Sequence, residues 1–417
     1  MLARWLGLAA LAAAVLPLAG CGGISGSESD AIGSPLSVYS SLPLQGPMAA
    51  ASAQIVNGEK LALAESNGHA GKFRVAFFSL DDSNATTGLW DPGVTAGNAK
   101  TAAQDPSTIA YIGDLDSGAT AVSLPLMNSV GILQVSPASP YIGLTSALDA
   151  GQDEPERFYP SGKRTFARLQ PGDAVQAAAQ AQLMNSLGVN SVYVVDDQDP
   201  FQVPLATIVA GDAEGEGIAV KAHDSLAMPS GANLTGEVEK IVESKAQAVF
   251  LAADEGPGPV ALWQALHAAD PKLLLFGSSS LASETFASQI GSAETQTYLS
   301  TPLLPIGMYP PSAQQVLGAY RARFGTEGGP WALYGFESMR SVLEAIRSAG
   351  DEGNDRVAVT ARFFATRAPN AVIGPFSIRP NGETSSTVYA VDRVSGGHLR
   401  FYRVLNAPRL PPATPGG

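Results

Sequence analysis

Short apolar runs alternate with segments of helical periodicity along most of this chain. The apolar runs are rich in β-branched and aromatic residues and predict buried strands at 36–40, 73–79, 109–112, 132–135, 191–195, 248–252 and 273–276. The segments between and after them predict helices at 48–67, 94–103, 120–129, 233–243, 258–269, 312–324 and 330–349. Strands that alternate with helices form parallel sheets covered on both faces.

One further helix can be delimited from its own residues. Its apolar positions recur every fourth residue and form a single stripe, which consists of Val175, Ala179, Leu183 and Leu187. Asp173 is suited to cap its start and Gly188 to end it. A second strand–helix series therefore begins after residues 168–170. The pattern predicts an α/β protein with two doubly wound parallel-sheet lobes.

The C-terminal part of the chain is less regular. Segment 301–309 contains prolines and is predicted to be a connector. Runs 372–378, 386–391 and 399–404 alternate with a period of two, which predicts antiparallel strands added to a sheet. Residues 406–417 are rich in proline and glycine and are predicted to form a disordered tail.

The N-terminus carries the clearest single motif. Arg4 precedes an apolar run at 5–16, and Leu-Ala-Gly precedes the only cysteine, Cys21, a pattern typical of a secretory signal peptide at 1–20. The position of Cys21 resembles a bacterial lipobox, which implies lipidation at Cys21 and a protein held outside the cytoplasm on a cell membrane, at the cell surface or in the periplasm. The alternative is an uncleaved anchor, but a membrane-spanning helix needs roughly 20 apolar residues. Residues 21–34 are small and polar and predict a flexible tether.

Composition and the absence of known short motifs argue against several classes of function. The formal net charge of −13 repels phosphate backbones, so we expect no nucleic-acid partner. With Cys21 lipidated, no thiol remains for a disulfide, a zinc–thiolate site or a cysteine nucleophile. The sequence lacks the short motifs of serine hydrolases, zinc proteases and P-loop enzymes, and its histidines are scattered: His69, His223, His267 and His398. We expect no catalytic residue, no cofactor and no metal. The acidic run 196–199 offers ligands for a hard cation, but a solvated turn is the favoured interpretation.

Six short sequence segments resemble segments of proteins with the type I periplasmic-binding fold, and they occur in the same order as in those proteins. Within this fold, the resemblance is to the branched-chain amino-acid (Leu/Ile/Val) substrate-binding proteins of ABC importers. They lie at 44–47, 111–117, 132–139, 166–169, 334–338 and 373–377, and the resemblance covers about 35–405. It implies a first lobe from 35–168 plus 302–376, and a second from 169–301 plus 377–405. It also implies a three-strand hinge, a ligand cleft between the lobes and a permease partner. We expect a monomer.

Ligands of open α/β sheets bind beyond the carboxyl ends of the strands. In the first lobe, Ser117 and Gly118 open a helix whose N–H groups suit a carboxylate, and the resemblance implies that role for the serine. Capping of its own helix is the alternative for Ser117. Ala138 and Ser139 match positions that receive the ligand headgroup, although proline at 140, where many members have threonine, departs from the pattern. Tyr141 is either an aromatic wall with a phenolic hydrogen bond or a packing residue.

In the second lobe, Phe201 matches an aromatic that closes over the ligand, with surface packing as the alternative. Ser279 stands where many members have the acid that binds the ligand ammonium. Asp254 or Glu255 could supply that charge instead, or could cap the next helix or stay solvated.

The leading hypothesis is a solute-binding lipoprotein that captures a small polar ligand, an amino acid or a related compound, for an ABC importer. The alternative is an extracytoplasmic sensor that acts through a partner protein without transport. A secreted hydrolase is a third possibility, which the missing motifs disfavour.

Overall fold

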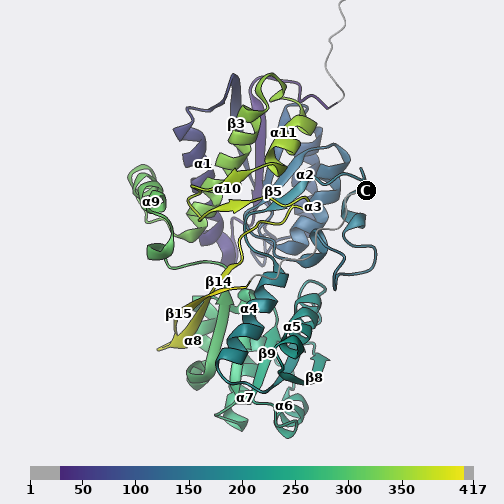
Figure 1. Cartoon of the computed structure of the whole chain (residues 1–417), viewed down its shortest axis with the longest axis vertical. Helices are drawn as coiled ribbons and strands as arrows, with labels where there is room; N and C mark the ends of the chain where they lie inside the picture. Colours follow the sequence, from purple (N-terminus) through teal and green to yellow (C-terminus); the bar gives the residue numbers. More distant parts are fainter. Residues whose placement is uncertain (1–28, 408–417) are drawn as a thin grey trace, which may run out of the picture.

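Each of two lobes is built around one central sheet, and the lobes stand end to end in Figure 1. The computed structural model describes residues 29–407. The predicted signal peptide, Cys21 and residues 408–417 lie outside this range.

The sheet of lobe one has six strands in the order β2-β3-β1-β4-β5-β6. All neighbouring strands are parallel except β2 and β3. The strands are β1 (Leu36–Leu42), β2 (His69–Ala70), β3 (Phe73–Asp81), β4 (Thr108–Gly113), β5 (Leu133–Ser136) and β6 (Phe166–Arg168). The residues of β1 and β4 are fully buried, as expected for central strands with helices on both faces.

Helices from distant parts of the chain cover this sheet. They are α1 (Ala49–Glu65), α2 (Pro92–Gln104), α3 (Ser117–Ser129), α9 (Pro311–Phe324), α10 (Pro330–Ser348) and α11 (Arg356–Phe364). Two glycines let α1 and α10 pack closely. A Cβ on Gly58 would lie 2.2 Å from the carbonyl oxygen of Ala332, and one on Gly335 would lie 2.1 Å from that of Ile55. A side chain at either position would collide with the backbone of the other helix.

The sheet of lobe two has seven strands in the order β15-β14-β11-β10-β9-β7-β8. The strands are β7 (Ser191–Asp196), β8 (Ala219–Ser225), β9 (Ala248–Ala252), β10 (Leu274–Gly277), β11 (Thr297–Thr301), β14 (Val388–Ser395) and β15 (His398–Asn406). The helices are α4 (Asp173–Ser186), α5 (Val203–Gly215), α6 (Thr235–Glu243), α7 (Pro257–Ala269) and α8 (Glu284–Gln289). β14 pairs antiparallel with both β11 and β15, which confirms the antiparallel strands predicted near the C-terminus.

The polypeptide crosses between the lobes at 169–172, 302–305 and 378–387, which forms the three-strand hinge. The first and third crossings run side by side, because the Arg168 N–H donates to the Gly382 carbonyl at 3.0 Å. A short pair, β12 (Arg367–Ala368) with β13 (Phe376–Ser377), precedes the third crossing.

Several sequence predictions need correction. Strands β8 and β11 and helices α5 and α11 were not predicted. β8 is an edge strand whose exposed and half-buried positions alternate, so it lacks an apolar run. Of run 372–378, only Phe376–Ser377 is a strand. Asp173 is the first residue of α4 and Gly172 is its N-cap, so the predicted capping role of Asp173 is wrong.

The predicted boundaries of the tether and of the tail also need correction. Residues 29–34 pack on lobe one: the N–H of Ala31 donates to the backbone carbonyl of Asn354 at 2.7 Å, and Ala31 is buried. The tether predicted at 21–34 is therefore wrong for residues 29–34. At the other end, β15 runs through Asn406 and Ala407 is buried.

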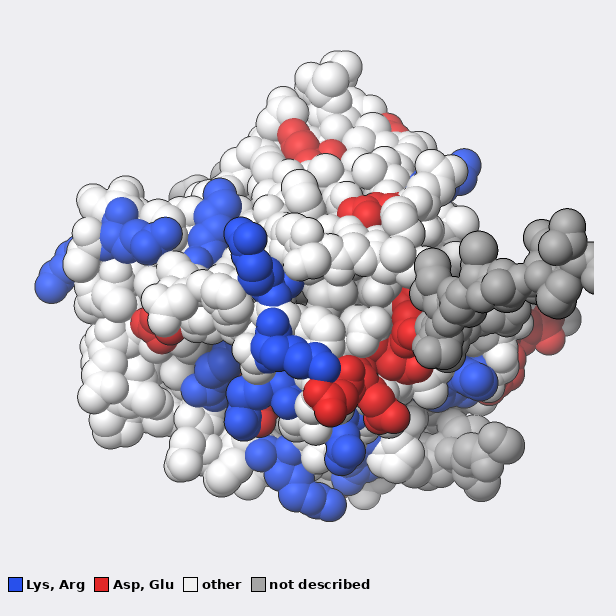
Figure 2. Space-filling view, turned by 90° about the horizontal axis from the view of Figure 1, so that it is seen from above, with Lys and Arg blue, Asp and Glu red and all other residues white. Residues whose placement is uncertain are grey.

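The end of lobe one away from the hinge, seen in Figure 2, carries gathered Lys and Arg side chains beside a group of Asp and Glu, although the chain as a whole is acidic.

Candidate ligand-binding site

The carboxyl ends of parallel strands from both lobes meet beside the hinge. Lobe one contributes the residues after β3, β4 and β5, and lobe two those after β7, β9 and β10. In open α/β sheets this edge is where ligands bind.

The start of α3 lies at the centre of this region. Asp116 is its N-cap residue and makes no capping hydrogen bond with its side chain. Ser117 is the first helical residue, and its Oγ accepts the N–H of Tyr141 at 3.2 Å. The hydroxyl thus ties the loop after β5 to α3, instead of capping its own helix. Gly118 follows, and a Cβ there would lie 2.4 Å from the Trp90 ring and 3.0 Å from the Phe201 ring.

The loop after β5 is held from within lobe one. Ser139 has a positive φ of 48°, and its hydroxyl lies 2.6 Å from the Thr120 hydroxyl. It also lies 3.0 Å from the Asp114 carbonyl. Ala138 and Ser139 are both buried. These two residues lie beside α3, and their polar groups are engaged in holding the loop.

Two aromatic rings meet across the lobes. The Tyr141 ring contacts the Phe201 ring edge-on, with centroids 5.0 Å apart and planes at 89°. The Tyr141 hydroxyl donates to Glu154, so the ring is what this residue presents to Phe201. Phe201 lies between β7 and α5 and therefore packs against the other lobe.

The two remaining predicted residues of lobe two, Asp254 and Ser279, differ in their contacts. Asp254 follows β9, is exposed, and accepts a hydrogen bond from Gln202 at 2.8 Å. Its charge also acts on Asp116 of lobe one, so the two carboxylates lie near each other. The Ser279 hydroxyl instead donates to Gln176 of α4 at 2.9 Å, inside lobe two.

Sequence reasoning missed three residues of this region: Asp82, Trp90 and Asp116. The signal was present for Asp82, because a strand was predicted at 73–79 and its carboxyl end faces the same edge. Trp90 comes from the loop that follows this strand, and only the folded chain places its ring over Gly118.

The acids here repel one another. Burial, together with the charges of Asp82 and Asp254, raises the pKa of Asp116 to about 7. Burial and the neighbouring Asp114 raise the pKa of Asp82, whose Oδ1 is buried without a hydrogen-bond partner. The Asp114 carboxylate has hydrogen-bond partners for both of its oxygens, since it accepts hydrogen bonds from the hydroxyls of Tyr111 and Ser123.

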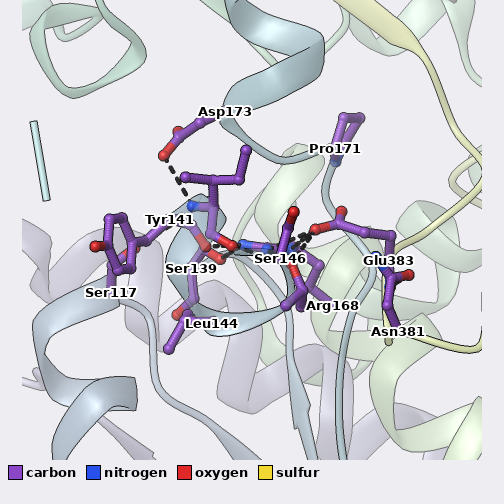
Figure 3. Close-up of polar contacts among 12 residues, drawn as sticks. Ser117, Ser139, Tyr141, Leu144, Ser146, Arg168, Pro171, Asp173, Asn381 and Glu383 are labelled. Carbon is purple, nitrogen blue, oxygen red and sulfur yellow. Dashed lines mark hydrogen bonds and ion pairs between the residues drawn. The ribbon is translucent and has the colours of Figure 1, made fainter. Parts of the chain in front are cut away.

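A buried ion pair supports the loop from the hinge side (Figure 3). Arg168 donates through Nε and Nη2 to Glu383 Oε1 at 3.1 and 2.6 Å, and both side chains are almost completely buried. Nη1 of the same guanidinium donates to the carbonyls of Ser139 and Tyr141. The pair therefore joins the first and third crossings to the loop that carries the predicted site residues.

A cavity of about 640 Å³ lies elsewhere, between α10 and residues 362–371. Its most buried charge, Glu337, pairs with Arg340 and accepts the Val372 N–H at 3.0 Å, so it is structurally engaged. Within residues 29–407, no group of His, Cys, Asp and Glu side chains has the geometry of a metal site. No helix in that range is long and apolar enough to span a membrane.

A family model described as periplasmic binding protein matches residues 40–398. The chain belongs to this family. Curated proteins gave no match to the chain.

Solved structures of periplasmic binding proteins share the fold over almost their whole length. A leucine-binding protein from Thermotoga maritima has a TM-score of 0.72 and 19% identity, over 89% of this chain and 99% of its own. A putative branched-chain amino acid ABC transporter protein from Rhodospirillum rubrum has a TM-score of 0.65 and 22% identity, over 88% and 100%. A solute-binding protein from R. palustris, in complex with benzoate, has a TM-score of 0.69 and 16% identity, over 91% and 98%. These likenesses confirm the two-lobed type I fold.

Proposed function

We propose that this periplasmic binding protein is an extracytoplasmic solute-binding lipoprotein that captures a small polar ligand between its lobes and delivers it to an ABC importer. The observation that carries the proposal is the contact of Tyr141 with Phe201 across the two lobes, beside the start of α3. A ligand held at this place touches both lobes, so its binding energy can favour the closed form.

The likeness to a leucine-binding protein and to a benzoate-bound protein supports a small organic solute. The division of lobes is proposed as predicted, with 35–168 and 302–376 forming lobe one. Cys21 is the proposed lipid attachment site, and the lipid would keep the protein near its permease. We propose a monomer with no catalytic residue and no cofactor.

A thermal-shift screen of residues 24–417 tests the proposal, because a ligand that binds only the folded protein raises its melting temperature. The screen covers amino acids, amines, aromatic acids, nucleosides and sugars. A hit should weaken at least tenfold in Ser117→Ala combined with Asp254→Ala, while the melting temperature without ligand changes little. The matched control is Asp351→Asn, because Asp351 is an exposed acid paired with Lys72 away from the cleft. Unchanged affinity in the single and double variants would remove the cleft assignment.

A further inference from the structure

The loop after β5 has no free backbone donor for a ligand carboxylate. Its N–H groups are bonded within lobe one, and position 140 is proline, which has none. The donor–acceptor pairs are Ala138 N–H to Ser136 Oγ at 3.0 Å, Ser139 N–H to Leu115 O at 3.2 Å and Tyr141 N–H to Ser117 Oγ at 3.2 Å. A carboxylate at this place would have to break these bonds.

The carboxylates around the start of α3 oppose an anion, although the N–H groups of its uncapped first turn would favour one. Asp116 occupies the N-cap, is only partly buried, and has no hydrogen-bond donor to its carboxylate among the described residues. The charges that act on it are those of Asp82 and Asp254. An anion held here would be repelled by carboxylates from both lobes, and water screens such repulsion less in a partly dry site.

The surroundings of Asp82 add to this argument. Asp82 is completely buried, and its Oδ1 has no hydrogen-bond partner although its charge reaches Asp116. A buried carboxylate oxygen without a partner is costly. A positive charge near Asp116 would offset this cost.

Aromatic rings complete the surroundings. The rings of Trp90 and Phe201 both pack closely against Gly118, and the Tyr141 ring packs edge-on against Phe201. Faces of aromatic rings attract ammonium and guanidinium groups. Rings and carboxylates together form the kind of site that binds an organic cation.

A bare metal ion does not fit the same groups. The described residues contain no cluster of three or more acidic, His or Cys side chains with metal-binding geometry. Asp82, Asp116 and Asp254 are therefore too dispersed to coordinate one ion together. A ligand that spans them has to be larger, with its charge on an extended or bulky organic group.

We infer that the ligand of this cleft is a small organic cation, an alkylammonium or guanidinium compound without a free carboxylate. The inference rests on the proposed function and specifies its ligand class. The cation lies between Asp116 of lobe one and Asp254 of lobe two and replaces their repulsion by two attractions. The ligand thus favours closure, because its charge is matched only when both carboxylates are close.

The test uses the full mature chain, extracted in detergent, and calorimetric titration at pH 8. The probes are choline, putrescine and agmatine, with leucine and benzoate as comparison ligands. At least one cation should bind saturably, whereas leucine and benzoate should not. Asp116→Asn should weaken the cation at least tenfold, and Phe201→Leu should weaken it at least threefold. Asp351→Asn, which alters an exposed acid away from the cleft, should leave it unchanged.

Saturable binding of leucine or benzoate without binding of any cation would overturn this inference and leave the proposed function standing. Cation binding that Asp116→Asn and Phe201→Leu do not weaken would also overturn it. If none of the five compounds binds up to 10 mM, roughly the weakest affinity that such a site would have, the inference is wrong. The proposed function is then decided by the wider thermal-shift screen.

Discussion

The Glu383 carboxylate accepts two hydrogen bonds from Arg168, which lies 215 positions earlier in the sequence, and both side chains are buried in the hinge. Thr145 donates to the same carboxylate oxygen at 2.5 Å. The guanidinium reaches on to the backbone of Ser139 and Tyr141. One ion pair thus connects two hinge crossings with one wall of the cleft.

Glu383→Gln should destabilise the protein by about 3 kcal/mol, because it leaves a buried guanidinium without its counter-charge. Chemical denaturation measures the effect. The matched control is Glu344→Gln, which breaks the exposed Arg347–Glu344 pair and should cost at most about 1 kcal/mol. Equal and small losses in both variants would show that the hinge pair does not stabilise the fold.

Gly118→Ala should prevent the lobes from closing as they do here, because the added methyl group would overlap the rings of Trp90 and Phe201. We expect ligand affinity to fall at least tenfold. Stability should fall by about 1–3 kcal/mol, because the Trp90 ring, which belongs to the same lobe, has to move away from the added methyl group. Titration calorimetry measures the affinity, and small-angle scattering with ligand measures closure. Gly97→Ala in α2, where nothing lies within 4 Å, is the control and should bind normally. Normal binding by Gly118→Ala would mean that the ligand-bound form lacks these contacts.

The ionisation of Asp116 should lower the free energy of unfolding as pH rises. Its folded pKa of about 7 exceeds its ordinary value, so the folded state holds the proton more tightly than the unfolded chain does. Its stabilising effect is therefore complete near pH 4 and is lost as pH rises towards 7. Because Asp116 is partly exposed, water screens the repulsion from Asp82 and Asp254. Asp116→Asn should thus be more stable than the wild type by about 1 kcal/mol at pH 8, or roughly 2–4 °C.

The two proteins should have the same stability near pH 4. Denaturation curves at both pH values check this difference. Asp351→Asn should show a small effect of opposite sign, because the partner Lys72 lowers the pKa of Asp351. A pH-independent gain in Asp116→Asn would assign the effect to packing instead of charge.

Cys21→Ser should move the protein from the membrane fraction to the soluble fraction without changing ligand affinity. The reason is distance along the chain: residues 29–34 pack against lobe one near Asn354, and the cleft is formed by other segments. Fractionation followed by immunoblotting measures the release. Ser27→Ala, a change within the same predicted tether, should remain in the membrane fraction. Membrane retention of Cys21→Ser would favour an uncleaved anchor.

The order of elements could be predicted from the sequence because each central strand is an uninterrupted apolar run between helical stripes. β4 and β9 are examples, with every residue buried. Edge strands are harder. β8 alternates exposed and half-buried positions, and its polar residues resemble a loop when seen alone. Ser117, Gly118, Tyr141 and Phe201 could be named from their positions after strands and from the family resemblance.

The sequence by itself determined the strand–helix order and the two-lobed class, and it predicts the lipobox at Cys21, since all three are local patterns. Only the tertiary structure decided which groups face one another. It brought Trp90 over Gly118, paired Arg168 with Glu383, and set Asp116 within reach of Asp82 and Asp254. The charge and hydrogen-bonding capacity of the cleft depend on such long-range contacts, which no local pattern encodes. For this reason the family resemblance suggested an amino acid or a related compound, whereas the contacts at the start of α3 are the basis of the proposed organic cation.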